Sequence, residues 1–178
     1  MHTPRGFTLM EMLTTLGVVA ILSTLAAPTF SDLRLNSSRT AAVNGFFHAL
    51  FLARSEAIKR GAVVSLCKSR DGQRCVAGAG AQWTDGYVVF VNSDRDEPAQ
   101  IDRGEEVLQI VEPWATGRIA ANRESFSFRP YTQGVVNGTV VFCDMRGADQ
   151  ARAIIISHTG RPRISQRDAS NRRLACPS

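Results

Sequence analysis

The most apolar part of the chain lies near its start. Residues 12–27 carry no charge, and the apolar run as a whole extends from Phe7 to Phe30. As an α-helix, residues 12–27 would measure about 24 Å, which is shorter than the ~30 Å hydrocarbon core of a bilayer. The full run is long enough, so the pattern predicts that residues 7–30 form a membrane-inserted helical segment.

Beyond this run, apolar residues recur at helical spacing as far as Gly61. The positions that share one face are Val43, Phe46, Leu50, Ala53 and Ala57, with Phe47, Phe51 and Ile58 widening the stripe. Lys59 and Arg60 suit the last turn of a helix, and glycine commonly follows its end. The pattern predicts one long helix over residues 7–60 that packs by this face. Pro28 should kink or weaken it, because its ring removes one backbone hydrogen bond.

From residue 62 onward the apolar spacing changes to that of short strands separated by Gly, Asn or Asp. The predicted strands are Val63–Lys68, Gly86–Asn92, Glu106–Val111, Ser125–Arg129, Thr139–Cys143, Ala151–Ser157 and Arg161–Ser165. The acidic stretch over residues 94–105 is predicted to form a loop. The expected fold is therefore α+β, with a long N-terminal helix packed on an antiparallel β-sheet head over residues 62–178.

Composition agrees with one globular domain plus an extension, since the 178 residues are 44% hydrophobic and 21% charged. The net charge of +5 matters less than its distribution. The basic tail, residues 160–178, carries Arg161, Arg163, Arg167, Arg172 and Arg173 against Asp168 alone. A local basic pole predicts an anionic partner such as nucleic acid or an acidic lipid surface.

Catalytic and metal-binding patterns are weak. His2, His48 and His158 share no spacing with a candidate nucleophile, and neither paired carboxylates nor a glycine-rich phosphate loop stands out. The sequence therefore predicts a non-enzyme without a cofactor.

One acidic pattern resembles the start of a calcium loop. Asn92, Asp94 and Asp96 alternate, but Glu97 stands where the loop needs glycine and Arg103 where it needs glutamate. A solvated loop without a metal is the better interpretation.

Four cysteines, Cys67, Cys75, Cys143 and Cys176, follow the apolar segment. By the positive-inside rule, Arg5 places the head in an oxidising compartment, and the absence of a C-x-x-C pair favours structural disulfides. Three connectivities are open at this stage. We favour Cys67 with Cys75, because Asp71-Gly72 between them is typical of a tight hairpin turn. Cys143 would then pair with Cys176 and tie down the tail.

The apolar segment contains one acid, Glu11. An ionised group at mid-depth in a bilayer costs about 2.5 kcal/mol or more, so such a residue indicates a function and a cationic partner. A cleaved secretory signal peptide is the alternative, but its positive region would hold only Arg5 and its apolar region would contain Glu11.

Gly6-Phe7-Thr8-Leu9 followed by Glu11 resembles the class III signal of type IV pilins and pseudopilins. The resemblance implies that residues 1–6 are a leader peptide, that a prepilin peptidase cuts after Gly6, and that Phe7 becomes N-methylated. It implies that Glu11 neutralises the N-terminal ammonium of a neighbouring pilin during assembly. It also implies a single-pass inner-membrane protein with a periplasmic head, which later moves to the pilus or cell surface.

Three further motifs resemble the FimT/GspH branch of minor pilins: RSEAIKRG at 54–61, GYVVFVN at 86–92 and GRPRIS at 160–165. The last has the form GRxRxS, which resembles the FimT side of the branch, associated with DNA uptake in natural transformation. The resemblance implies a minor type IV pilin that joins major and minor pilins and binds double-stranded DNA. The alternatives are a GspH-like pseudopilin of a type II secretion system, or a subunit that primes pilus assembly without binding DNA.

The DNA-binding residues are predicted to be Arg161, Arg163, Ser165, Arg167, Arg172 and Arg173. In an extended strand Arg161, Arg163 and Ser165 share one face, with neighbouring members about 6.6 Å apart. Pro162 has no backbone N–H to donate to a neighbouring strand, and this predicts that the segment is an edge strand or lies outside the sheet. Arginine side chains form hydrogen bonds with phosphate oxygens, and no helix or loop in the sequence looks suited to contact base edges. Binding to DNA should therefore be independent of its sequence. The alternative is a flexible, solvated basic end.

Overall fold

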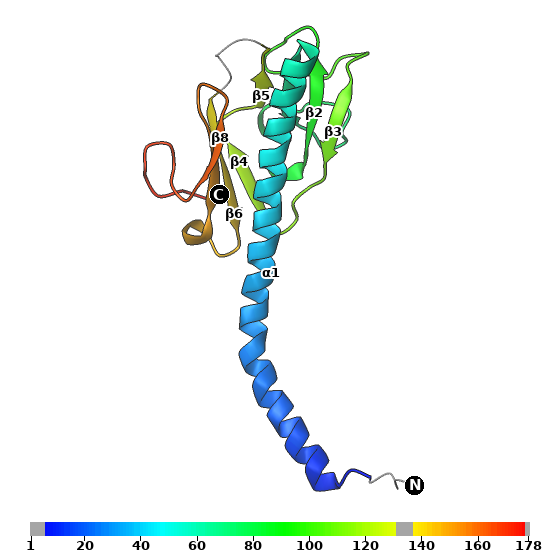
Figure 1. Cartoon of the computed structure of the whole chain (residues 1–178), viewed down its shortest axis with the longest axis vertical. Helices are drawn as coiled ribbons and strands as arrows, with labels where there is room; N and C mark the ends of the chain where they lie inside the picture. The colour runs from blue at the N-terminus through cyan, green and yellow to red at the C-terminus, as the bar shows by residue number, and fades with distance from the viewer. Residues whose placement is uncertain (1–5, 131–136, 177–178) are drawn as a thin grey trace. The chain divides into compact units, whose positions relative to one another are not determined.

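The structure is a computed structural model that describes residues 6–130 and 137–176, without the side chains of residues 25–29. It contains two compact units, Met1–Ser37 and Ser38–Ser178. Helix α1 (Leu9–Arg60) contributes its first part to one unit and its last part to the other. The second unit contains every strand among the described residues and is called the head below (Figure 1).

Apolar side chains are exposed at the start of α1 and immediately before it. Phe7, Leu9 and Met10 are each more than 70% exposed. Among the described residues, no helix has the combination of length and apolar character that a bilayer crossing requires. The helix continues through Pro28, which therefore does not end it. The side chain of Pro28, and with it the predicted kink, lies outside the described residues.

The head contains two four-stranded antiparallel sheets. The first, in the order β3-β2-β1-β5, consists of β1 (Val63–Lys68), β2 (Tyr87–Asn92), β3 (Val107–Val111) and β5 (Ser125–Phe128). The second, in the order β4-β6-β7-β8, consists of β4 (Gly117–Ala121), β6 (Gly138–Asp144), β7 (Arg152–Ile156) and β8 (Pro162–Ser165). Short 3₁₀ turns lie at Gly78–Gly80, Trp83–Asp85 and Ala148–Gln150. The predicted fold class, a long helix on an antiparallel head, is confirmed.

The sequence-based strand assignment missed β4. Its sequence, GRIAA, has glycine and two alanines, which have low intrinsic strand preference. Pairing with β6 over five residue pairs, such as Ala120 with Val141, makes it a strand. Six predicted strand ends lie one residue outside β2, β3, β5, β7 and β8, namely Gly86, Glu106, Arg129, Ala151, Ser157 and Arg161.

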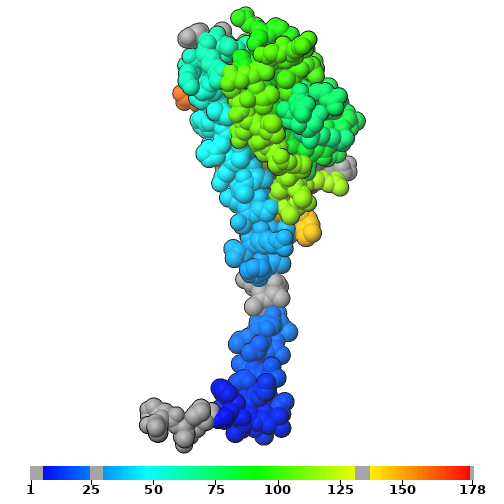
Figure 2. Space-filling model, turned by 90° about the vertical axis from the view of Figure 1, so that its right-hand side faces the viewer, coloured from blue at the N-terminus to red at the C-terminus, as the bar shows by residue number. Residues whose placement is uncertain are grey.

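The last part of α1 packs on both sheets through the predicted face. Val43, Phe46, Leu50, Ala53 and Ala57 are all buried. Phe51 and Ile58 were expected to widen this face, but they point outward and are 47% and 52% exposed. In Figure 2 the exposed side of α1 (cyan) borders surface coloured green. The stripe is narrower than predicted because the sheets cover only one side of the helix.

Both disulfides have the pairing that the sequence favours, Cys67 with Cys75 and Cys143 with Cys176. The expected hairpin between Cys67 and Cys75 is wrong, because β1 pairs with β2 and β5 instead. The intervening residues form an irregular loop, in which the Asp71 carboxylate accepts hydrogen bonds from the backbone N–H groups of Gln73 and Arg74. These bonds, the Gln73 bond foremost, lower the pKa of Asp71 to about 2.

Candidate nucleic-acid interface

The first two tail arginines follow a tight turn between β7 and β8. The Gly160 N–H donates to the Ser157 carbonyl at 2.8 Å, and the Ser157 N–H donates to the Arg161 carbonyl at 3.1 Å. Gly160 is buried and has a φ of 72°, a conformation that side-chain-bearing residues seldom adopt. The glycine of the GRxRxS motif therefore allows the turn that leads into the arginines.

Strand β8 lies at the edge of the second sheet, as Pro162 predicted. Arg163 pairs with Ile155 and Ile164 with Ile154, so the side chains of Arg163 and Ile164 point to opposite faces. Arg161 and Arg163 are both exposed. Within the part of the chain that the structure describes, neither guanidinium has a hydrogen-bond or ion-pair partner. Both are therefore available to an anionic ligand.

The rest of the tail is a compact loop. Arg167 and Arg173 form an isolated antiparallel bridge, and the Asp168 N–H donates to the Arg172 carbonyl at 3.0 Å. Asn171 closes the turn with a φ of 63°. The alternative of a flexible basic end does not fit this bonded geometry.

Two of the predicted binding arginines already contact acids. Arg172 Nε lies 2.8 Å from Asp168 Oδ2, and Arg173 lies 3.8 Å from Asp149. The Arg172 N–H, followed by the Arg172 side chain, lowers the pKa of Asp168. Exposed pairs of this kind contribute little, about 0–1 kcal/mol, so a phosphate could compete for either arginine.

Ser165 and Arg167 are engaged with neighbouring backbone groups. Ser165 Oγ accepts the Arg167 N–H at 3.1 Å, and Arg167 donates to the Asn171 carbonyl at 3.1 Å. Arg161 and Arg163 thus form the open part of the predicted site, while the other four residues also hold the loop together.

The end of the tail is fixed to the second sheet. Leu174 is 6% exposed and packs with Cys143, Ala151 and Ala153, and the Cys143–Cys176 disulfide adds a covalent link. The sequence expectation that this bridge ties down the tail agrees with the packing.

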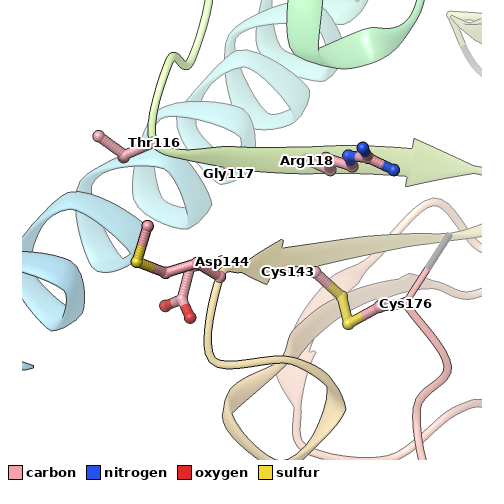
Figure 3. Close-up of a pocket in the computed structure, with 7 residues that line it drawn as sticks. Thr116, Gly117, Arg118, Cys143, Asp144 and Cys176 are labelled. Carbon is pink, nitrogen blue, oxygen red and sulfur yellow. A yellow bond between two sulfur atoms is a disulfide. The ribbon is translucent and has the colours of Figure 1, made fainter. Parts of the chain in front are cut away.

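A pocket of about 400 Å³ lies beside this disulfide (Figure 3). It is lined by Thr116, Gly117, Arg118, Cys143, Asp144, Met145 and Cys176. The Asp144 side chain is 1% exposed and forms a salt bridge with Arg146 at 2.6 Å, and this contact lowers the pKa of Asp144. Arg118 is exposed on β4 and was missed by sequence reasoning, because β4 itself was missed.

The acidic loop gathers three carboxylates. Those of Asp94, Asp96 and Asp102 have oxygens within 4.8 Å of one another, whereas the sequence pattern had included Asn92 instead of Asp102. Asn92 is fully buried, and its amide donates to Asp96 Oδ1 at 3.0 Å. Partial desolvation and the neighbouring acids, Asp94 first, raise the pKa of Asp102. Hydrogen bonds within the loop account for the positions of Asn92 and Asp96.

At the other end of the chain, Glu11 takes part in a helix cap. The Glu11 N–H donates to Thr8 Oγ1 at 3.2 Å, and the Thr8 N–H donates to Glu11 Oε2 at 3.4 Å. This reciprocal pair is a capping box at the first turn of α1. The Thr-x-x-Glu spacing was readable in the sequence. Phe7, which precedes the cap, is 87% exposed.

A long helix packed on an antiparallel head, preceded by this N-terminal motif, defines a pilin-like subunit. The sequence matches the family model of the type II transport protein GspH over residues 42–160, and that of the prokaryotic N-terminal methylation motif over residues 1–27. The chain therefore belongs to the GspH family and is a pilin-like subunit of the GspH/FimT kind.

The chain is also similar to a pilin-like protein, PilA1, of Thermus thermophilus. The two are 30% identical over 172 residues, which is 91% of this chain and 99% of the relative. Two crystal structures of the type IV minor pilin FimU of Pseudomonas aeruginosa have the same fold, with TM-scores of 0.51 and 0.52 at 18% identity. They cover 74% and 71% of this chain, and 88% and 91% of their own.

Proposed function

We propose that this minor pilin joins a type IV pilus and binds duplex DNA without sequence preference through its tail, in support of DNA uptake during natural transformation. One observation carries the proposal. Arg163 is exposed on the edge strand β8 and Arg161 is exposed immediately before it, and within the described residues no acid or carbonyl contacts either guanidinium. Arg167, Arg172 and Arg173 extend the positive surface on the ordered loop that follows.

The physical basis is contact with phosphate. Guanidinium groups form paired, charge-assisted hydrogen bonds with phosphate oxygens, and such contacts fix a protein on a duplex without reading its sequence. If about three to five phosphates are neutralised, the logarithm of the binding constant should fall linearly with the logarithm of the salt concentration, with a slope of about −3 to −4.5. A single subunit would bind weakly, and further sites along a fibre would supply avidity.

The test is a double substitution, Arg161→Gln with Arg163→Gln, in the full chain kept in solution by a non-ionic detergent. We expect affinity for unrelated duplexes to fall about tenfold or more and the salt slope to flatten by about 1.8, because two phosphate contacts are lost. The melting temperature should stay nearly unchanged, since both side chains are exposed. Fluorescence anisotropy across a salt series gives both quantities.

The matched control is Arg70→Gln with Arg74→Gln, which removes the same charge from the loop after β1. These arginines pair with Asp85 and Asp71 and lie far along the chain from the tail. Equal DNA binding by the tail variant and the parent, with the same salt slope, would remove the main support for the uptake proposal.

The N-terminal segment would hold the subunit in the membrane before its assembly into the pilus. Residues 1–6 are a leader, a prepilin peptidase cuts after Gly6, and Phe7 is then methylated. Residues 7–30 hold the subunit in the inner membrane with its head in the periplasm, until Glu11 pairs with the N-terminal ammonium of a neighbouring pilin. The match to the N-terminal methylation motif over residues 1–27 supports this part.

The second candidate is a GspH-like pseudopilin of a type II secretion system, or a priming subunit without DNA binding. The match to the GspH family model over residues 42–160 favours it, because that match ends before Arg161. Binding of duplex DNA by the full chain would support the DNA-uptake function. No binding of duplex DNA, even at low salt, would support a role in secretion or in priming of assembly.

A further inference from the structure

An arginine of α1 contacts the turn that carries the proposed DNA-binding arginines. Arg54 Nη1 donates a hydrogen bond to the backbone carbonyl of Thr159 at 3.2 Å, between residues 105 positions apart in the sequence. Arg54 is half-buried. The contact therefore joins the helix directly to the β7–β8 turn.

A series of hydrogen bonds within the turn connects Thr159 to Arg161. The Ser157 and Thr159 hydroxyls are 2.8 Å apart, and the Arg161 N–H donates to Ser157 Oγ at 3.2 Å. Together with the two backbone bonds that close the turn at Gly160 and Arg161, these contacts link Thr159 to the first DNA-binding arginine. In Figure 1 the turn that leads into β8 lies at the top of the second sheet.

We propose that Arg54 is a positioning residue of the DNA interface, which holds the Thr159 carbonyl and so presents Arg161 and Arg163 in a fixed arrangement. The inference rests on the proposed function. A binding segment that is ordered before its ligand arrives loses less conformational freedom on binding, and this raises affinity without any new contact. The role of Arg54 is thus distinct from that of a phosphate ligand.

The test compares Arg54→Met and Arg54→Lys in the full chain with non-ionic detergent, using duplex DNA of random sequence. We expect Arg54→Met to weaken binding about fivefold, because the turn must then be ordered on binding. The salt slope should stay within about 0.3 of the parent value, since no phosphate contact is lost. Arg54→Lys keeps a donor for the carbonyl and should recover most of the affinity.

Two controls separate positioning from charge and from folding. Arg74→Met removes one arginine from the loop after β1 and should bind DNA as the parent does. Amide hydrogen exchange at Gly160 and Arg161 should become faster in Arg54→Met, while amides of β6 keep their protection. In the background of Arg161→Gln with Arg163→Gln, Arg54→Met should have no further effect on binding.

The outcomes are distinguishable. A salt slope that flattens by about 0.9 in Arg54→Met would make Arg54 a phosphate contact and overturn the positioning role. Unchanged affinity in Arg54→Met, while the Arg161 and Arg163 double variant loses binding, overturns the inference and leaves the proposed function standing. Absence of DNA binding by the parent overturns both.

Discussion

At the scale of single residues, Glu11 has two physical roles that the sequence alone did not separate. Its hydrogen bonds with Thr8 form a capping box, which satisfies backbone N–H groups at the start of α1. Its proposed role in the fibre is to neutralise the ammonium of a neighbouring subunit. The first role needs an oxygen acceptor, whereas the second needs a negative charge.

Substitution can separate these roles, because glutamine keeps the acceptor and loses the charge. If charge neutralisation drives assembly, Glu11→Gln and Glu11→Ala should both lower incorporation into sheared pilus fractions at least about tenfold, since an unpaired buried ammonium costs several kcal/mol. Membrane insertion should be intact or improved in both. Quantitative immunoblots of the pilus and membrane fractions give the ratio of incorporated to membrane-bound subunit.

The cleavage state of Gly6 must be measured on the same samples. Uncut precursor in both variants would mean that Glu11 serves peptidase recognition instead. Normal incorporation of Glu11→Gln beside poor incorporation of Glu11→Ala would assign the effect to the helix cap.

At the scale of elements, the tail is a loop organised by one carboxylate. Asp168 accepts hydrogen bonds from the backbone N–H groups of Ser170 and Arg172, both at 2.8 Å, and from Arg172 Nε. These contacts lower the pKa of Asp168 in the folded state, the Arg172 backbone bond having the largest effect. The stabilisation from Asp168 is therefore present above its unfolded pKa of about 3.9 and is lost as pH falls through the lower folded value.

The corresponding prediction is an acid transition confined to the tail loop. The ¹H–¹⁵N amide signals of Ser170 and Arg172 should stay constant from pH 7 to about 4 and should titrate with a midpoint below the unfolded value of about 3.9. In Asp168→Asn the titration should disappear. A midpoint at or above the unfolded value would contradict the hydrogen-bonded geometry of the loop.

At the scale of the head, one aromatic residue of α1 connects the two sheets. The Phe46 ring lies 4.8 Å from the Tyr87 ring, 6.1 Å from that of Phe126 and 5.8 Å from that of Phe142. Tyr87 and Phe126 belong to the first sheet, and Phe142 belongs to the second. Burial raises the pKa of the Tyr87 hydroxyl well above its ordinary range. The helix thus makes one core from two sheets.

Phe46→Ala should lower the free energy of unfolding by about 3–5 kcal/mol, because it leaves a cavity where both sheets meet the helix. Phe51→Ala is the matched control on the same helix, since Phe51 is 47% exposed, and should cost less than about 1 kcal/mol. Urea denaturation of the full chain followed by circular dichroism, with disulfides intact, measures both. Similar losses in the two variants would show that Phe46 is not central to the core.

Local patterns along the chain determined much of this protein. Helical spacing identified the buried face of α1, and Pro162 placed β8 at a sheet edge. The disulfide pairs were predicted correctly, although the hairpin from which Cys67–Cys75 was argued does not form. Arg161 and Arg163 were recognised from a short motif, and both are exposed, Arg163 on the edge strand β8 and Arg161 immediately before it. Such features depend on residues close together in sequence, so periodicity and backbone chemistry predict them.

Only the tertiary structure decided how distant segments meet. β4 is a strand because β6 pairs with it, and residues of α1 pack in one core with residues of both sheets. The contacts of Arg173 with Asp149 and of Arg54 with Thr159 join residues that no local pattern relates. Their partners are set by the packing of sheet and helix, which depends on the whole core and has no signature at either residue.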